Sequence, residues 1–271
     1  VDGQIGLEKS PAEFVQALVE VFREVKRVLA TDGTCWINLG DTYSNSGLGG
    51  NPDESGFRKQ ATNRGSLLQE RRSVEGYKPK NLLGIPWRVA FALQDDGWYL
   101  RSEIIWHKPN SMPESVTDRP TKSHETIFLL AKSERYFYDA DSIKEQRVDS
   151  LEITMRKRGT NSKYQNSNLK GNHLATQQFD ENGRNKRTVW TVATQPYSGS
   201  HFATFPEKLI EPCILAGCPA GGTVLDPFGG SGTTGRVATK LGRNSILIEL
   251  NPNYLTLIEK RTDKVQIKMA M

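Results

Sequence analysis

Apolar side chains recur every three or four positions between Phe14 and Leu29, with charged residues between them. This spacing puts the apolar residues on one face, so it predicts an amphipathic helix. Ser10 is a candidate N-cap, because a proline follows it directly and Glu13 stands where a capping box has its glutamate. Gly33 can end the element, so the first helix is expected between Ser10 and Gly33.

Short apolar runs alternate with further helical patterns along the rest of the chain. Strands are predicted at 34–39, 99–106, 125–131, 136–138, 223–225 and 245–248, and helices at 85–93, at 206–216 and from about residue 252. Alternation of this kind predicts an α/β fold with a mostly parallel sheet covered by helices on both faces. Ligands of such sheets bind at the carboxyl ends of the strands.

The strand at 223–225 runs into the segment Asp226-Pro-Phe-Gly-Gly-Ser-Gly-Thr-Thr234, which precedes a helical pattern. A strand that ends at an acidic residue, turns through glycines and opens a helix brings backbone N–H groups close to a ligand. No lysine follows Gly232, so the pattern of a phosphate-binding P-loop is not met. The spacing from Gly230 to Gly235 fits a dinucleotide fingerprint, but a single match of this kind is weak.

Glu249 makes the expected ligand more specific. It follows the strand at 245–248, about twenty residues after the turn, where an acidic side chain can accept hydrogen bonds from a ribose diol. A ligand that contains adenosine is therefore indicated. The alternative is that 229–235 is only a tight connection between strand and helix, and that Glu249 is a solvated strand end.

Composition is compatible with one main domain that binds such a ligand. The chain has 271 residues, of which 36% are hydrophobic, so it can bury a full α/β core. Its three cysteines form no Cys-x-x-Cys spacing and no His-x-x-x-His spacing occurs, so neither a zinc site nor a disulfide framework is expected. A reducing compartment fits best. No apolar run approaches the ~18 residues of a membrane span, so we expect a soluble, cytoplasmic protein.

Positive charge concentrates in the segment 144–187, which has ten Lys or Arg residues against five Asp or Glu. The segment is also rich in Asn, Gln, Ser and Gly. Basic side chains can neutralise phosphates, and Arg, Asn and Gln can hydrogen-bond base edges. A DNA-reading insertion is one interpretation and a solvated loop is the other. The candidate DNA-binding residues are Arg156, Lys157, Arg158, Lys163, Lys170, Arg184, Lys186 and Arg187.

A second polar stretch, at 44–80, has little apolar periodicity. Long connections inside compact domains are usually functional or disordered. The stretch could cover a substrate cleft or could be an ordinary surface loop, and the sequence leaves both interpretations open.

The segment from Asp226 to Thr234 closely resembles the cofactor motif of the DNA methyltransferases that modify amino groups, at cytosine N4 or adenine N6. The resemblance extends over most of the chain, through 36–43, 97–110, 123–130, 201–210 and 242–251. The order of these segments is similar to the β arrangement of that family, in which the catalytic half precedes the cofactor half. It implies a circularly permuted, doubly wound fold that binds S-adenosylmethionine, with a catalytic half at 1–143, a polar target-recognition insertion at 144–188 and a cofactor half at 189–271.

The resemblance also implies roles for individual residues. The methionine end of S-adenosylmethionine would be wrapped by Asp226, Phe228, Gly229, Gly230, Ser231, Gly232 and Thr233, and the ribose would be held by Glu249 with Asn251 nearby. Thr204, Phe205 and Pro206 would close over the cofactor, Lys208 would meet its carboxylate, and Asp41 would line the site. Core packing is the alternative for the two phenylalanines, and a structural cap or turn is the alternative for Asp41.

The chain departs from the family at the catalytic motif. Family members carry a Ser/Asp/Asn-Pro-Pro-Tyr/Phe tetrapeptide before the first helix, and nothing similar occurs between Val1 and Ser10. The catalytic residues are therefore expected upstream of Val1, and the chain is expected to begin just after them. Thr194-Gln-Pro-Tyr197 has one proline and is not assigned catalysis. The cysteines lack the Pro-Cys setting of a carbon-5 cytosine methyltransferase.

The resemblance implies that the intact protein methylates an exocyclic amino group in duplex DNA, by base flipping and direct transfer without a metal. The chain alone would then methylate poorly. Expected partners are double-stranded DNA and a cognate restriction endonuclease, in a bacterial or phage setting. A catalytically silent DNA-binding protein and a nicotinamide-dependent oxidoreductase are the alternatives. The target base, the recognition sequence and the oligomeric state stay open.

Overall fold

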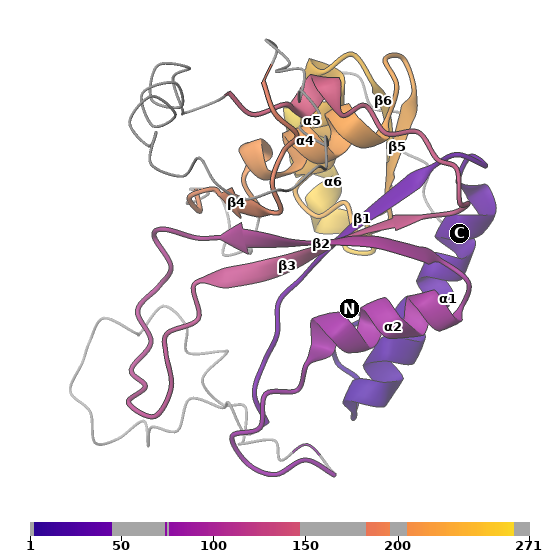
Figure 1. Cartoon of the computed structure of the whole chain (residues 1–271). Coiled ribbons are helices and arrows are strands. Elements are labelled where there is room, and N and C mark those ends of the chain that lie inside the picture. The colour runs from indigo at the N-terminus through magenta and orange to yellow at the C-terminus, as the bar shows by residue number, and fades with distance from the viewer. Residues whose placement is uncertain (1–2, 45–73, 75, 147–182, 196–204, 263–271) are drawn as a thin grey trace, which may run out of the picture.

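The computed structural model describes residues 3–44, 74, 76–146, 183–195 and 205–262 (Figure 1). Its strands are β1 (Thr34–Leu39), β2 (Tyr99–His107), β3 (His124–Ala131), β4 (Val189–Thr191), β5 (Thr223–Asp226) and β6 (Asn244–Leu247). Its α-helices are α1 (Pro11–Val28), α2 (Ile85–Asp95), α4 (Glu207–Gly217), α5 (Thr233–Lys240) and α6 (Leu255–Arg261), and η2 (Asp141–Ile143) and η3 (Pro252–Tyr254) are short 3-10 helices. In this part of the chain, no helix is long and apolar enough to cross a membrane.

Helix α1 begins as its sequence predicts. The Ser10 hydroxyl accepts a hydrogen bond from the Glu13 N–H at 3.2 Å, and Pro11 occupies the first helical position. The Glu13 carboxylate accepts from the Lys9 N–H at 3.0 Å, one residue earlier than in a standard capping box. These bonds satisfy backbone donors that the first turn leaves free, so the helix start is well defined.

The strands form a four-stranded sheet in the order β1-β3-β2-β4 and a two-stranded sheet of β5 and β6. Strand β3 is antiparallel to both β1 and β2, whereas β4 is parallel to β2 and β5 is parallel to β6. The expectation of a mostly parallel sheet was therefore wrong for β3. The connection between β2 and β3 contains no helix, so it returns the chain beside β2 in the opposite direction.

The prediction of a strand at 136–138 was also wrong. The Phe137 N–H donates to the Asp32 carbonyl at 2.8 Å, and the Asp139 N–H donates to the Ala216 carbonyl at 2.9 Å. Because these two bonds reach different segments, residues 136–138 cannot build a ladder with either one.

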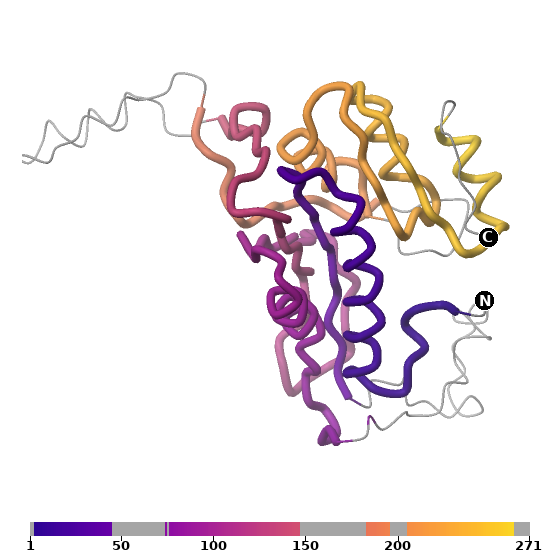
Figure 2. The backbone as a smooth tube through the Cα atoms, turned by 90° about the vertical axis from the view of Figure 1, so that its right-hand side faces the viewer, coloured from indigo at the N-terminus to yellow at the C-terminus, as the bar shows by residue number. Residues whose placement is uncertain are grey.

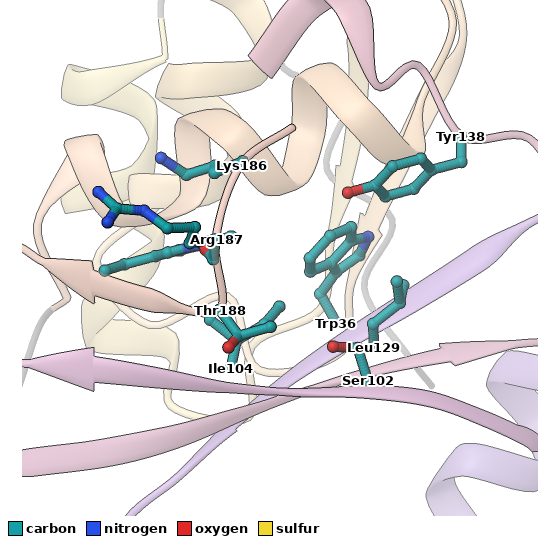
Figure 3. Close-up of a pocket in the computed structure, with 9 residues that line it drawn as sticks. Trp36, Ser102, Ile104, Leu129, Tyr138, Lys186, Arg187 and Thr188 are labelled. Atoms are coloured by element: carbon teal, nitrogen blue, oxygen red, sulfur yellow. The ribbon is translucent and has the colours of Figure 1, made fainter. Parts of the chain in front are cut away.

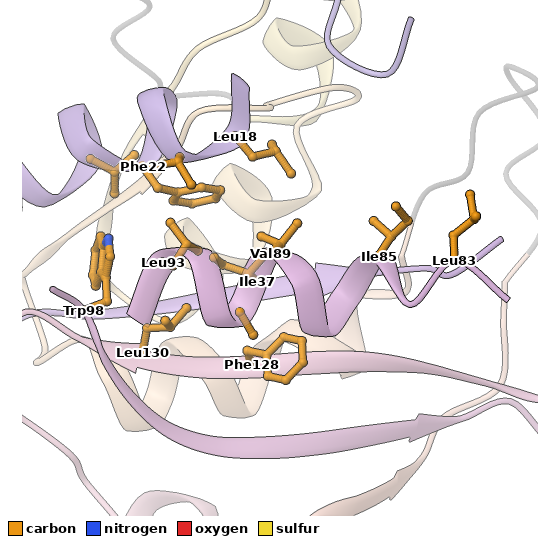
Figure 4. Packing of buried hydrophobic residues seen from close by; sticks show 13 residues of the cluster. Leu18, Phe22, Ile37, Leu83, Ile85, Val89, Leu93, Trp98, Phe128 and Leu130 are labelled. Carbon is orange, nitrogen blue, oxygen red and sulfur yellow. The ribbon is translucent and has the colours of Figure 1, made fainter. Parts of the chain in front are cut away.

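Helices cover both faces of the larger sheet, as predicted. On one face, Leu18 and Phe22 of α1 and Val89 of α2 pack with Ile37 and Phe128 of the sheet (Figure 4). On the other face, the buried residues Leu209 and Cys213 of α4 pack with Ile104, Trp106, Ile127 and Trp190.

We call the side where β1, β2 and β4 begin the amino edge and the side where they end the carboxyl edge. Strand β5 starts from the amino edge as well, because α4, which leads into it, ends against the beginning of β1. The Thr34 hydroxyl donates to the Gly217 carbonyl at 3.3 Å, and a Cβ at Gly217 would lie 2.5 Å from that hydroxyl oxygen. In Figure 2, β1 and β6 both run from the top of the view towards the bottom. Asp226 therefore lies on the carboxyl side.

The two polar stretches leave the fold at different places. Residues 45–73 follow Ser44, which lies beyond the end of β1 and exchanges backbone hydrogen bonds with 80–81. Residues 147–182 follow a stem in which Glu145 pairs with Arg184, close to η2, which contacts α4. Gly183 has φ +116°, and a Cβ there would lie 2.6 Å from the Glu145 carbonyl oxygen, so this pairing requires glycine.

Candidate functional site

The turn after β5 is built around the Asp226 carboxylate. One oxygen accepts a hydrogen bond from the Phe228 N–H at 2.9 Å, and the other accepts from the Thr234 hydroxyl at 2.5 Å. Burial raises the pKa of the Asp226 carboxyl, and the negative charge of Glu249 raises it further, while the two hydrogen bonds act in the opposite direction. The fold thus holds a carboxylate where water stabilises it poorly.

Glycines let this turn lie directly against β6. Gly230 and Gly232 have φ of +50° and +80°, which other residues rarely adopt. At Gly229 the backbone N–H donates to the Ile248 carbonyl at 2.8 Å, and a Cβ there would lie 3.1 Å from the Leu247 Cβ. A side chain at Gly229 would therefore push the turn away from the strand.

Glu249 joins the end of β6 to the same turn. Its two carboxylate oxygens accept from the Gly230 N–H at 2.7 Å and from the Asn251 N–H at 2.8 Å. Each oxygen keeps a free lone pair for a ligand hydroxyl. Asn251 itself caps η3, because its side-chain oxygen accepts from the Asn253 N–H at 3.1 Å. The structure therefore brings Asp226, the glycine turn and Glu249 together, as the sequence predicted.

Arg261 also belongs to this site, and sequence reasoning missed it. Its guanidinium donates to the Ser231 hydroxyl at 2.7 Å and to the Ser231 carbonyl at 3.2 Å, and it lies 3.4 Å from the Thr233 hydroxyl. Ser231 and Thr233 are both buried. Their side chains thus tie the turn to α6, and a basic residue three positions after the apolar Ile258 was the only signal in the sequence.

The segment expected to close over the cofactor is described in part. Thr204 lies outside the described residues, Phe205 packs against the core cluster of α4 and β2, and Pro206 is the buried N-cap residue of α4. Lys208 is exposed on α4. For Phe205 the packing alternative is therefore observed. Phe228 differs, because the residue is 48% exposed, with its ring centre 6.4 Å from the ring centre of Phe22.

Asp41 has a structural role. Its side-chain oxygen accepts from the Thr42 N–H at 2.9 Å and from the Ile85 N–H at 3.0 Å, so it caps α2, and Lys122 donates to its carbonyl at 3.3 Å. The alternative of a structural cap is thus present, and its role towards a cofactor stays a prediction.

The candidate DNA-binding residues are only partly described. Arg156, Lys157, Arg158, Lys163 and Lys170 lie outside the described residues. Arg187 forms an ion pair with Glu145 at 2.9 Å and Arg184 one at 3.4 Å, so one carboxylate offsets part of their charge. The Lys186 ammonium lies 5.1 Å from the centre of the Trp190 ring. Lys186 and Arg187 border a cavity of about 70 Å³ beside Trp36 and Tyr138 (Figure 3).

The cysteines are unsuited to nucleophilic chemistry in this structure. Burial raises the pKa of the Cys35 thiol to about 12, and the nearby negative charge of Asp226 adds to this. Burial also raises the pKa values of Cys213 and Cys218. Thiolates are therefore scarce at neutral pH. Within the described ranges, no group of three His, Cys, Asp or Glu side chains is placed to hold a metal ion.

Comparison with known proteins identifies the family. Residues 2–260 match the N6/N4 methyltransferase family model, which is described as DNA methylase. The type II methyltransferase M.Cfr9I of Citrobacter freundii is 46% identical over 263 residues, which cover 96% of this chain and 75% of the relative. M.SmaI of Serratia marcescens is 46% identical over 260 residues, which cover 96% and 77%.

Solved structures agree in fold. The PvuII DNA methyltransferase, which is cytosine-N4-specific, matches with a TM-score of 0.61 at 18% identity, over 96% of this chain and 74% of its own. The M1.HpyAVI complex with SAM matches with a TM-score of 0.51 at 18% identity, over 90% and 81%. The chain therefore belongs to the N6/N4 family of DNA methylases and is a site-specific type II DNA methyltransferase that depends on S-adenosylmethionine.

Proposed function

We propose that the chain holds S-adenosylmethionine at the turn between Asp226 and Glu249 and serves methyl transfer to cytosine N4 or adenine N6 in duplex DNA. The observation that carries this proposal is the hydrogen bond from the Gly230 N–H to Glu249, because it joins the Glu249 carboxylate to the same glycine turn that is built around Asp226. The raised pKa of Asp226 fits a cationic ligand, which would stabilise the ionised carboxylate.

Each residue of the site has a defined task in this proposal. Glu249 accepts hydrogen bonds from the ribose hydroxyls, and Asp226 offsets the positive charge of the ligand. The exposed ring of Phe228 lies beside the turn, where it can cover the ligand and exclude water. When bound, S-adenosylmethionine supplies a methyl group on a sulfonium. The protein then contributes mainly by position, since it holds that methyl in line with an amino nitrogen of a flipped base.

We also infer a circular permutation. The strand that carries the glycine turn is β5, after four other strands, whereas a nucleotide-binding half usually begins with that strand. In this interpretation, 1–143 is the catalytic half, 144–188 reads the target and 189–271 is the cofactor half. The basic residues of 144–188 would neutralise DNA phosphates, and a cognate restriction endonuclease would cut the same sequence when it is unmethylated.

Titration calorimetry of the chain itself tests the cofactor site. We expect binding of S-adenosylmethionine, no response to NAD, and a loss of affinity of about tenfold or more in Glu249→Gln, which weakens charged hydrogen bonds. Binding of NAD in place of S-adenosylmethionine would overturn the proposed site and favour an oxidoreductase.

Single-molecule sequencing of DNA from a methylation-free host that expresses the intact protein tests the reaction. A modified cytosine or adenine in one sequence context is expected, and it identifies base and site together. A plasmid from this host should resist an endonuclease that cuts at that sequence. DNA binding without any methylation would support the silent DNA-binding alternative.

A further inference from the structure

The loop at 108–123, which joins β2 to β3, lies at the carboxyl edge of the sheet. It leaves β2 after His107 and enters β3 at His124, and these two residues are cross-strand partners. Asp226 and Glu249 also follow the carboxyl ends of their strands. Duplex DNA that offers a base to a methyl donor at this turn must therefore approach the carboxyl edge.

Contacts at both ends of the loop hold it in place. The Asn110 side chain donates to the Thr194 carbonyl at 3.0 Å and accepts from the Thr194 N–H at 2.9 Å, so it acts like a backbone partner for that segment. On the other side, Arg119 forms an ion pair with Glu114 at 2.5 Å and lies 4.2 Å from the centre of the Tyr43 ring.

Met112 lies between these two anchors and is 86% exposed. It is the most exposed of the large hydrophobic side chains in the described part of the chain, where Val189 follows with 59%. Pro113 follows Met112 directly and restricts the backbone there. A loop that is anchored at both ends thus presents an apolar side chain to solvent at the carboxyl edge.

We propose that this loop is a docking surface for duplex DNA and that Met112 inserts beside an unstacked base. The proposal rests on the function proposed above. Proteins that deform DNA insert apolar wedges, methionine among them, between base steps. Base flipping opens such a space in the stack. An anchored loop loses little conformational entropy when it binds, so the insertion is not opposed by ordering the loop.

The stem of the basic insertion lies elsewhere. The pair of Glu145 and Arg184 is close to η2, which contacts α4, whereas 108–123 joins the ends of β2 and β3 at the carboxyl edge. The proposed contact with the base stack therefore involves the loop with Met112 and not this stem.

Fluorescence titration of a short duplex tests the proposal, with 2-aminopurine at the methylated position that sequencing identifies. Met112→Ala should bind this duplex about tenfold more weakly, as expected for the loss of one buried apolar side chain, and should raise the 2-aminopurine emission less. Met112→Leu keeps the apolar volume and should bind within about twofold of the unaltered chain. Val28→Ala is the matched control, because Val28 is 56% exposed at the end of α1, at the amino edge.

Calorimetry should give the same affinity for S-adenosylmethionine in all three variants. Duplex binding and emission of Met112→Ala that equal those of the unaltered chain would overturn this proposal and leave the proposed function intact. An equal loss in Val28→Ala would also overturn it, because the effect would then be unspecific. If the unaltered chain binds no duplex, both the proposed function and this inference fail.

Discussion

Asp226 is the residue at which stability and ligand binding oppose each other. Its pKa is raised by burial, so the folded protein binds this proton more tightly than the unfolded chain does. The favourable contribution of Asp226 is therefore complete below the ordinary aspartate pKa and is lost as pH rises through the raised value. Above the raised pKa, ionisation of the carboxylate lowers the free energy of unfolding of the ligand-free protein.

Asp226→Asn is therefore expected to melt at a higher temperature than the unaltered protein at pH 7, and this difference should shrink as pH falls towards about 4. The same substitution should weaken binding of S-adenosylmethionine by about tenfold, because an amide does not offset positive charge. Scanning calorimetry at the two pH values and titration calorimetry measure both effects. Glu211→Gln, an exposed site on α4, is the control. A lower melting temperature together with unchanged affinity would contradict this account.

At this scale the sequence predicted much of the site, because Asp226, the glycines and Glu249 are linked by local rules of strand, turn and strand end. Arg261 could not be found in the same way. Its partners Ser231 and Thr233 lie about thirty positions earlier, and only the packing of α6 on the turn brings them together. The contact could not be predicted because Arg261 lies far from these partners in the sequence, although its side chain is a common hydrogen-bond donor.

Among the elements, α6 is expected to hold the turn in its binding conformation. Arg261→Ala should weaken binding of S-adenosylmethionine by about tenfold, since it removes charged hydrogen bonds to Ser231. The rate at saturating cofactor should stay close to that of the unaltered protein. Lys260→Ala is the control, because Lys260 is the exposed neighbour on the same helix. Unchanged affinity in Arg261→Ala, measured by titration calorimetry, would contradict the proposed role of α6 in holding the turn.

Helix α2 offers a test of the two interpretations of Asp41. The Asp41 carboxylate caps the helix through the Ile85 N–H, so Asp41→Ala should lower the free energy of unfolding by about 1 kcal/mol in urea. Asp41→Asn keeps an acceptor oxygen and should lose less. Affinity for S-adenosylmethionine should not change in either variant. A loss of affinity without a loss of stability would instead support the role in cofactor binding that the family resemblance implied.

In the whole molecule, the alternation of helices and strands correctly predicted an α/β fold with both sheet faces covered. It did not predict the direction of β3, because periodicity shows that a strand exists but not which way it runs. The missing signal was the connection at 108–123: a parallel neighbour needs a crossover, usually a helix, and this loop has none.

The pairing of Glu145 with Arg184 has a consequence for how this molecule can diversify. These residues exchange backbone hydrogen bonds of 2.9 and 3.0 Å, so they fasten together the two ends of whatever sequence lies between them. The entropy of closing such a loop changes by only about 0.6 kcal/mol for each doubling of its length. The sequence between this pair can therefore change in length at a small cost in free energy, while the scaffold that the pair joins keeps its sequence.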